Sequence, residues 1–338
     1  MSAALWVAVA ACGSADQATP GSSADPDAGA SAAGNDGAVP APGDASARPP
    51  GTSNDAAADA TATTGSYDQD GSVPFTTKVE QVTNGGHTFN VTSYVPMTSG
   101  LHPAVSFSCG STQTAAGYVP YATRLASHGI AMFLRDDPGA LTKTADIIDD
   151  AVYVVSTWLP ATYASTIDSK RIGLGGHSRG GAVSLLAGEG GLKGKVVAWF
   201  GLDPVDNQFG MSPGAFARTN VGQIGIPTAY LGASVTSNCA PAADGYATLF
   251  PATAAPSVLL LGNGAGHTQL EVASACTACG LCSPSGTVDS NVVLAYATRY
   301  FFAFFARELL GDTSVGAKFD GAGAPADVAA GLITVTSK

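Results

Sequence analysis

The chain has 338 residues, 45% of them hydrophobic, and therefore enough apolar surface for one sizeable core. Its 15 basic and 26 acidic residues give a net charge of −11, and residues 1–72 account for −8 of it with nine Asp, no Glu and one Arg, Arg48. The nearly neutral remainder has no basic stripe that follows a phosphate backbone, which argues against a nucleic-acid partner.

Residues 1–12 have the pattern of an export signal. An apolar run covers residues 3–11, ends at Cys12 and is far shorter than the roughly 20 residues that a membrane-spanning helix needs. The segment 9–12, Val-Ala-Ala-Cys, resembles the lipobox of bacterial lipoproteins, in which the Cys is lipidated and becomes the mature N-terminus. No Lys or Arg precedes the run, so either the true start lies upstream of Met1 or the signal is atypical; the alternative is an alanine-rich start with a chance Cys.

This pattern predicts an exported protein. We expect either a lipoprotein at the outer surface or in the periplasm, or a secreted protein. Its contact with a membrane would then be limited to a lipid anchor on Cys12.

Residues 13–72 are predicted to form a disordered linker. They are mostly Ala, Gly, Ser, Pro and Asp, with Tyr67 as the single aromatic residue, and such a composition buries too little apolar surface to offset the entropy of ordering. Mutual repulsion of the Asp carboxylates keeps such a chain extended. The linker therefore separates the signal from one catalytic domain, residues 73–338.

After residue 72, short apolar runs alternate with amphipathic stretches. This alternation of strands and helices predicts an α/β domain with a mostly parallel sheet that helices cover on both faces. Continuous apolar runs such as 257–261 suit central strands that are buried on both sides. The predicted strands are 88–95, 104–108, 130–135, 171–175, 196–202, 227–231 and 257–261, and the predicted helices are 118–127, 144–158, 180–187 and 291–310.

The strongest chemical signal is a G-x-S-x-G motif at residues 176–180. It directly follows the predicted strand 171–175 and opens the predicted helix 180–187, which is the setting of a nucleophile elbow and not of an ordinary glycine-rich turn. In an elbow the Ser is strained and only small neighbours tolerate the close approach of the backbone. The turn exposes the hydroxyl and directs backbone N–H groups to the reacting centre. Ser178 is therefore the predicted nucleophile.

A serine hydroxyl at its normal pKa is a poor nucleophile and needs an imidazole base, which in turn needs a carboxylate to hold it. The chain order in the α/β-hydrolase fold is Ser, then acid, then His. His267 is the single histidine after Ser178, and the glycine-rich stretch 262–266, predicted as a loop, can deliver it to the elbow. We predict His267 as the general base, the alternative being a histidine of a surface loop.

Four carboxylates lie between Ser178 and His267. Asp203 follows the predicted strand 196–202 at the carboxyl edge of the sheet, where the active sites of parallel sheets gather. Asp206 lies one loop turn later, Asp244 lies in a longer loop, and Glu189 falls near the end of the helix after the nucleophile. Asp203 is the predicted acid, with Asp206 and Asp244 as the alternatives.

These motifs resemble those of plant chlorophyllases, α/β-hydrolases that cleave the phytyl ester of chlorophyll. The resemblance rests on residues 176–181, Gly-His-Ser-Arg-Gly-Gly, and 201–206, Gly-Leu-Asp-Pro-Val-Asp, and on shorter segments at 239–241, 266–267 and 279–282. It implies an α/β-hydrolase fold, a serine esterase activity and Asp203 as the acid of the triad. It supports the mechanism and leaves the ester open.

The segment 124–129, with Cys-Gly-Ser at 109–111 upstream of it, is also similar to bacterial cutinase-like polyester hydrolases, PET hydrolases among them. That resemblance implies an oxyanion hole formed by the backbone N–H groups of Ser111 and of Arg179, the residue after the nucleophile. Two features of that family are missing here: an acid after the strand at 227–231, and a paired-aromatic clamp around the scissile ester.

Five cysteines follow Cys12. The three at 276, 279 and 282 suit a zinc or iron–sulfur site if a fourth ligand joins them. Disulfides are the more typical use in an exported protein. The four residues Cys239, Cys276, Cys279 and Cys282 form an even set that allows three connectivities, and we expect them to staple the loop after His267 without a metal. Cys109 is left over as a buried small residue.

The sequence thus predicts a serine carboxylic-ester hydrolase that needs no cofactor and acts as a monomer. Its substrate is a hydrophobic ester, small or polymeric, in the manner of a lipase, a cutinase, a polyester hydrolase or a chlorophyllase. Two alternatives stay open: a catalytically silent α/β-hydrolase fold that serves as a surface binding module, and a peptidase or acyltransferase that uses the same triad.

Overall fold

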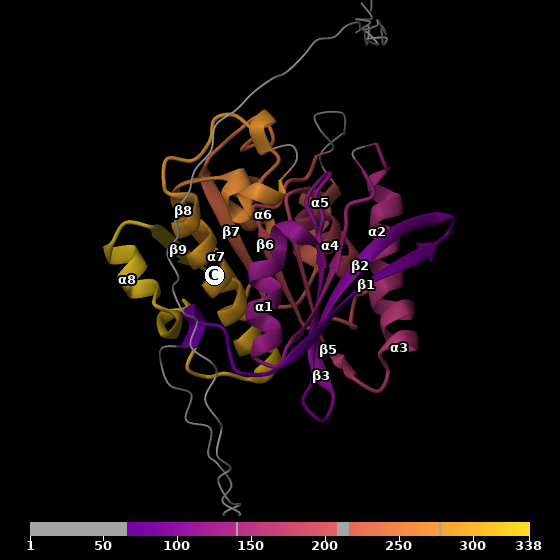
Figure 1. Cartoon of the computed structure of the whole chain (residues 1–338). Coiled ribbons are helices and arrows are strands. Elements are labelled where there is room, and N and C mark those ends of the chain that lie inside the picture. The colour runs from indigo at the N-terminus through magenta and orange to yellow at the C-terminus, as the bar shows by residue number, and fades with distance from the viewer. Residues whose placement is uncertain (1–65, 140, 208–215, 277–278) are drawn as a thin grey trace, which may run out of the picture. The chain divides into compact units, whose positions relative to one another are not determined.

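A nine-stranded sheet runs through the computed structural model, which describes residues 66–139, 141–207, 216–276 and 279–338 (Figure 1). The strand order is β1-β2-β4-β3-β5-β6-β7-β8-β9. Strands β4, β3, β5, β6, β7 and β8 are parallel neighbours, and β1, β2 and β9 pair antiparallel at the two edges. The strands are β1 (Phe75–Asn84), β2 (His87–Pro96), β3 (His102–Ser108), β4 (Ala131–Arg135), β5 (Ile167–His177), β6 (Ala198–Leu202), β7 (Thr228–Val235), β8 (Ser257–Gly266) and β9 (Ile333–Ser337).

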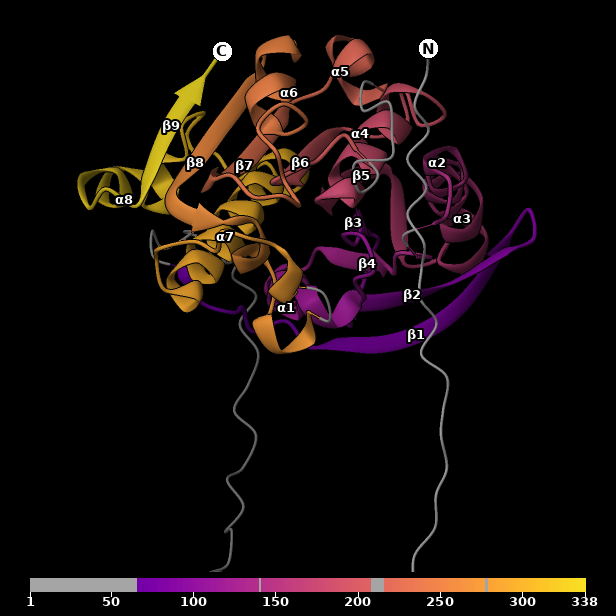
Figure 2. The ribbon, with the colours of Figure 1, turned by 90° about the horizontal axis from the view of Figure 1, so that it is seen from above.

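Helices cover both faces of this sheet and enclose two hydrophobic cores (Figure 2). Helices α1 and α7 contribute to one core, in which Phe301 and Phe305 of α7 pack against Phe200 of β6. Helices α2, α4, α5 and α6 contribute to the other, where the rings of Trp199 of β6 and Tyr230 of β7 pack edge to face. The helices are α1 (Val119–Ser127), α2 (Thr144–Tyr153), α3 (Leu159–Thr162), α4 (Arg179–Glu189), α5 (Phe216–Asn220), α6 (Tyr246–Ala252), α7 (Ser290–Phe305) and α8 (Ala324–Ala329).

This arrangement confirms the predicted α/β class, with a mostly parallel sheet between two helical layers. Each of the seven predicted strands has its counterpart, from β2 to β8. The edge strands β1 and β9 lack a clear apolar pattern, because β1 pairs with a neighbour on one side only and most of its side chains face solvent. Among the described residues, no helix is long and apolar enough to cross a membrane.

The prediction of a loop at 262–266 was wrong. These residues continue β8 as far as Gly266, where they pair with β7, the last pair being Val235 with Gly266. The glycines therefore lie where a Cβ would come too close to neighbouring atoms, side chains at Gly262 and Gly264 and backbone at Gly266. A Cβ at Gly266, for example, would lie 2.4 Å from the backbone nitrogen of Gly286.

The predicted export signal, Cys12 and residues 13–65 of the predicted linker lie outside the described residues. Its last residues, 66–72, are described and pack against the body. The Tyr67 ring is buried 5.8 Å from the ring of Phe302, and its hydroxyl donates to Asp312 (2.8 Å). Asp70 pairs with Arg124 of α1 at 2.8 Å. Packing onto the body thus starts before the predicted boundary at residue 73.

Candidate active site

Ser178 occupies the sharp turn between β5 and α4. Its backbone has φ 55° and ψ −130°, a conformation with positive φ that residues other than glycine rarely adopt. The turn is fixed from both sides, because the Ser178 N–H donates to the carbonyl of Leu202 (3.1 Å) and the Ser178 carbonyl accepts from the N–H of Gly181 (3.0 Å). The strained conformation is therefore held by β6 on one side and by the first turn of α4 on the other.

The glycines of the motif are required by this packing. A Cβ at Gly176 would lie 2.3 Å from the carbonyl oxygen of Gly180, and one at Gly180 would lie 2.2 Å from the carbonyl oxygen of Ser108. A Cβ at Gly181 would lie 2.8 Å from the Cβ of Pro204. Side chains at these positions would push the elbow away from β3 and from the loop after β6.

Two hydrogen bonds connect Ser178, His267 and Asp203. The Ser178 hydroxyl lies 2.9 Å from Nε2 of His267, and Nδ1 of His267 lies 2.7 Å from Oδ2 of Asp203. The side chains of His267 and Asp203 are 5% and 4% exposed. Because a carboxylate can only accept, Nδ1 carries the proton, which leaves Nε2 to accept from the Ser178 hydroxyl. The structure thus brings the three predicted triad residues into hydrogen-bonding order.

Asp203 is the first residue after β6 and is itself in a left-handed conformation, with φ 36°. Its Oδ1 accepts from the N–H of Ala233 (3.1 Å), and its own N–H donates to the carbonyl of Leu231 (2.7 Å). The neighbouring strand β7 therefore fixes the carboxylate in place. Of the alternative acids, Asp206 donates its N–H to the carbonyl of Asp244 (2.7 Å), and Glu189 ends α4.

His177, the residue before the nucleophile, contacts His267 through a hydrogen bond and through its ring. Its Nε2 donates to the carbonyl of His267 (3.1 Å), its Nδ1 accepts from the Tyr118 hydroxyl (2.8 Å), and the two imidazole rings lie 4.6 Å apart. Burial, and then the neighbouring His267, hold the pKa of His177 well below its usual value, so the ring is neutral. The sequence placed His177 beside the nucleophile and gave no indication of this bond.

The residues of the predicted oxyanion donors, Ser111 and Arg179, line the same pocket as Ser178. In the loop after β3, the N–H of Gly110 donates to the Tyr118 hydroxyl (3.1 Å) and the N–H of Thr112 donates to Oδ1 of Asp137 (3.0 Å). Between them, the Ser111 N–H has no acceptor among the described residues. Arg179 is the first residue of α4 and directly follows Ser178.

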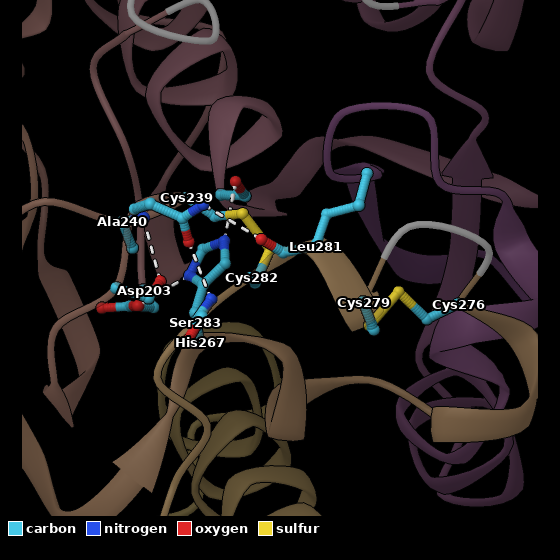
Figure 3. Close-up of a disulfide and its surroundings, with 12 residues drawn as sticks. Asp203, Cys239, Ala240, His267, Cys276, Cys279, Leu281, Cys282 and Ser283 are labelled. Carbon is cyan, nitrogen blue, oxygen red and sulfur yellow. Dashed lines mark hydrogen bonds and ion pairs between the residues drawn. A yellow bond between two sulfur atoms is a disulfide. The ribbon is translucent and has the colours of Figure 1, made fainter.

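The pocket in front of Ser178 has a volume of about 320 Å³. Its walls include Val205 and Asn207 from the loop after β6, Leu281, and both disulfides. Figure 3 shows the side chain of Leu281 between the two disulfides, and this residue is 75% exposed. A volume of this size lies at the lower end of the range for ligand pockets.

Glu271 also lines this pocket, although no sequence motif pointed to it. It is 3% exposed, and its Oε2 has no hydrogen-bond partner among the described residues. Its Oε1 lies 3.3 Å from Sγ of Cys279, which is in a disulfide and so has no proton to donate. Burial raises the pKa of Glu271 to about 7, although His267 and Tyr118 lower it in part.

The four cysteines expected to pair do so, as Cys239–Cys282 and Cys276–Cys279. The first disulfide joins the segment after β7 to the segment after His267 (Figure 3). The alternative prediction of a metal site has a geometric basis, because ligand atoms of Glu271, Cys276 and Cys279 lie within 4.8 Å of one another. The two sulfurs are bonded to each other, however, and are not free as thiolate ligands. Cys109 is buried and unpaired, as expected, and burial raises the pKa of its thiol.

Comparison with known proteins identifies no relative. No model of a known protein family matches the chain, and no curated protein is similar to it in sequence. The resemblance to chlorophyllases and polyester hydrolases therefore rests on the short motifs quoted above.

Proposed function

We propose that this protein is a serine hydrolase of the α/β-hydrolase type that cleaves carboxylic esters. The observation that carries the proposal is the relay from Ser178 through His267 to Asp203, with bonds of 2.9 and 2.7 Å, at a strained elbow. The strand order supports it, since the elbow and the acid follow neighbouring central strands, β5 and β6, at the same edge of the sheet. The chain order Ser, Asp, His is that of the α/β-hydrolase fold.

The proposed reaction begins when His267 Nε2 takes the proton of the Ser178 hydroxyl as its oxygen attacks the ester carbonyl. The tetrahedral oxyanion accepts hydrogen bonds from the N–H groups of Ser111 and Arg179. His267 then gives its proton to the leaving alcohol, and an acyl-enzyme forms on Ser178. Water then loses a proton to His267 as its oxygen attacks the acyl carbon; the bond to Ser178 Oγ breaks, His267 returns the proton to Oγ, and the carboxylic acid leaves. Asp203 stabilises the imidazolium in both halves of the cycle and stays ionised.

The pocket supports a hydrophobic ester with one short acyl or alkyl group inside it. Its volume of about 320 Å³ suits a small group, and the exposed Leu281 at its rim offers an apolar contact for the part of the substrate that stays outside. A short-chain ester and the end of an aliphatic or aromatic polyester chain both meet this description. Turnover rates on a panel of short acyl esters, long acyl esters, polyester film and chlorophyll distinguish a lipase, a cutinase, a polyester hydrolase and a chlorophyllase.

Three alternatives share this fold: a silent binding module, a peptidase and an acyltransferase. A silent binding module would not need the strained conformation of Ser178, which costs of the order of 1–3 kcal/mol and would be relieved without loss by another residue. A peptidase usually adds a charged site for a chain terminus, and in this pocket the guanidinium of Arg179 is already bonded to Asp137. An acyltransferase differs from an ester hydrolase only in the acceptor that replaces water, so analysis of the products distinguishes acyl transfer from hydrolysis.

The test is the turnover of p-nitrophenyl butyrate by the wild type, by Ser178→Ala and by Ser337→Ala, a matched control at an exposed position of β9. We expect the wild type and Ser337→Ala to release nitrophenol and butyrate at equal rates, and Ser178→Ala to lose at least about 10³-fold in kcat. An inactive wild type would refute ester hydrolysis. Equal rates for all three proteins would remove Ser178 from the role of nucleophile.

A further inference from the structure

One carboxylate, that of Asp137, contacts both segments that carry the proposed oxyanion donors. Asp137 lies in the loop after β4, and its side chain is 2% exposed. Its Oδ1 accepts from the backbone N–H of Thr112 (3.0 Å), the residue after Ser111. Both of its oxygens accept from Nη2 of Arg179, at 2.7 and 2.6 Å. A single side chain thus links the loop after β3 to the first residue of α4.

The bond to Thr112 determines which N–H groups of the loop remain available. Of three successive N–H groups, that of Gly110 donates to the Tyr118 hydroxyl and that of Thr112 donates to Asp137. The middle residue, Ser111, lines the pocket, and its N–H has no acceptor among the described residues. Thr112 has φ 62°, a conformation that favours glycine. A residue holds such a conformation only where its surroundings impose it, and the Asp137 carboxylate is the group that bonds its N–H.

The bonds to Arg179 fix the side chain of the first residue of α4. The Arg179 side chain is 3% exposed, and Nη2 also donates to the carbonyl of Gly139 (3.0 Å). Asp137 in turn accepts from the N–H of Gly139 (2.9 Å), which closes a small network around the charge pair. Charged partners in this geometry and at this burial form short, directional bonds, and they fix the position of the groups that carry them.

We infer that Asp137 is a positioning residue for the oxyanion hole, which it assembles by holding the Ser111–Thr112 peptide and the start of α4 at a fixed separation. The inference rests on the proposed function. Donors that stand in place before the reaction stabilise the developing negative charge without reorganisation, so a loosened loop lowers kcat and leaves the binding of the ground state unchanged.

Two double variants isolate this role from the loss of a buried charge. Asp137→Asn/Arg179→Met and Asp137→Leu/Arg179→Met both remove the whole ion pair. The Asn and Leu side chains at position 137 have similar volumes. Only Asn keeps an oxygen that can accept from the Thr112 N–H. We expect kcat for p-nitrophenyl butyrate to be about 10- to 100-fold lower in the Leu variant than in the Asn variant, with KM equal within about twofold.

A second readout follows the oxyanion itself. A trifluoromethyl ketone that forms a tetrahedral adduct with Ser178 should bind the Leu variant more weakly by the same factor, whereas 1-butanol, an uncharged competitor that carries no oxyanion, should bind both variants equally. Thermal unfolding of both proteins checks that they are folded. If Leu prevents folding, Asp137→Ala/Arg179→Met removes the same acceptor without a bulky side chain.

The outcome distinguishes this inference from the proposed function. Equal kcat and equal ketone affinity in the Asn and Leu variants, in an enzyme whose activity depends on Ser178, would overturn the positioning role and leave the esterase intact. A wild type that neither turns over the ester nor binds the ketone would overturn both.

Discussion

Glu271 is the buried carboxyl whose surroundings give the clearest pH-dependent prediction. It is 3% exposed, and burial outweighs the stabilisation that its carboxylate receives from His267 and Tyr118. Glu271→Gln keeps the size and shape of the side chain and removes the ionisable group. The variant therefore measures what it costs this fold to hold a negative charge at that place.

The magnitude follows from the pKa of about 7, against 4.5 for an unperturbed Glu. Below pH 4.5 the carboxyl is protonated in the folded and unfolded states alike and has no effect on stability. Between pH 4.5 and 7 the folded protein retains a proton that the unfolded chain has released, so stability falls as the pH rises, by about 3 kcal/mol in total. Above pH 7 the whole penalty is present.

Urea unfolding of the wild type and of Glu271→Gln, followed by tryptophan fluorescence at pH 5 and at pH 8, measures the effect. The advantage of the variant in unfolding free energy should grow by about 2.5 kcal/mol between the two pH values. Glu308→Gln, which removes a carboxyl bonded to Arg307, is the control, and its effect should change by less than about 1 kcal/mol. An advantage of Glu271→Gln that is the same at both pH values would refute this account of the Glu271 environment.

Three further predictions concern the triad, the elbow and the disulfides. Asp203→Asn should lower kcat for p-nitrophenyl butyrate by about 10⁴-fold, because the imidazole loses the carboxylate that fixes its tautomer, whereas Asp206→Asn should lower it less than tenfold; the reverse ranking would move the role of the acid. Gly180→Ala places a Cβ 2.2 Å from a backbone carbonyl of β3, so it should lower both the unfolding temperature and kcat, and an unchanged kcat would contradict the elbow geometry. Cys239→Ser opens a disulfide whose partners lie 43 residues apart and should reduce the unfolding free energy by about 4 kcal/mol in urea, while a loss below about 1 kcal/mol would show that the loop is held by its other contacts.

The sequence predicts the central part of the fold because a buried parallel strand is a continuous apolar run and an elbow is a glycine motif between a strand and a helix. The edge strands β1 and β9 have neighbours on one side only, and their polar, solvent-facing residues weaken that signal. The glycines at 262–266 have the composition of a loop. The structure uses them in β8, where neighbouring side chains and backbone come too close for a Cβ.

The candidate site likewise contains residues that the sequence predicts and residues that it does not. Ser178, His267 and Asp203 follow from chain order and from the ends of strands, because the mechanism itself dictates their types and their sequence. Asp137 and Glu271 do not, because the role of either depends on what lies opposite it in space. Asp137 is 42 residues from Arg179 in the chain, and no motif specifies that pair. A carboxylate after β4 has the same appearance in the sequence whether it faces solvent or bonds a buried guanidinium.

The central claim is that Ser178 is a nucleophile activated by His267, and covalent labelling tests it most directly. Incubation with an alkyl fluorophosphonate, followed by mass analysis of the intact protein and its peptides, should show one adduct per chain on Ser178. The adduct should be absent from Ser178→Ala and should form at least about 10³-fold more slowly in His267→Ala. A wild type that stays unlabelled, or that is labelled at another residue or equally fast without His267, would contradict the account.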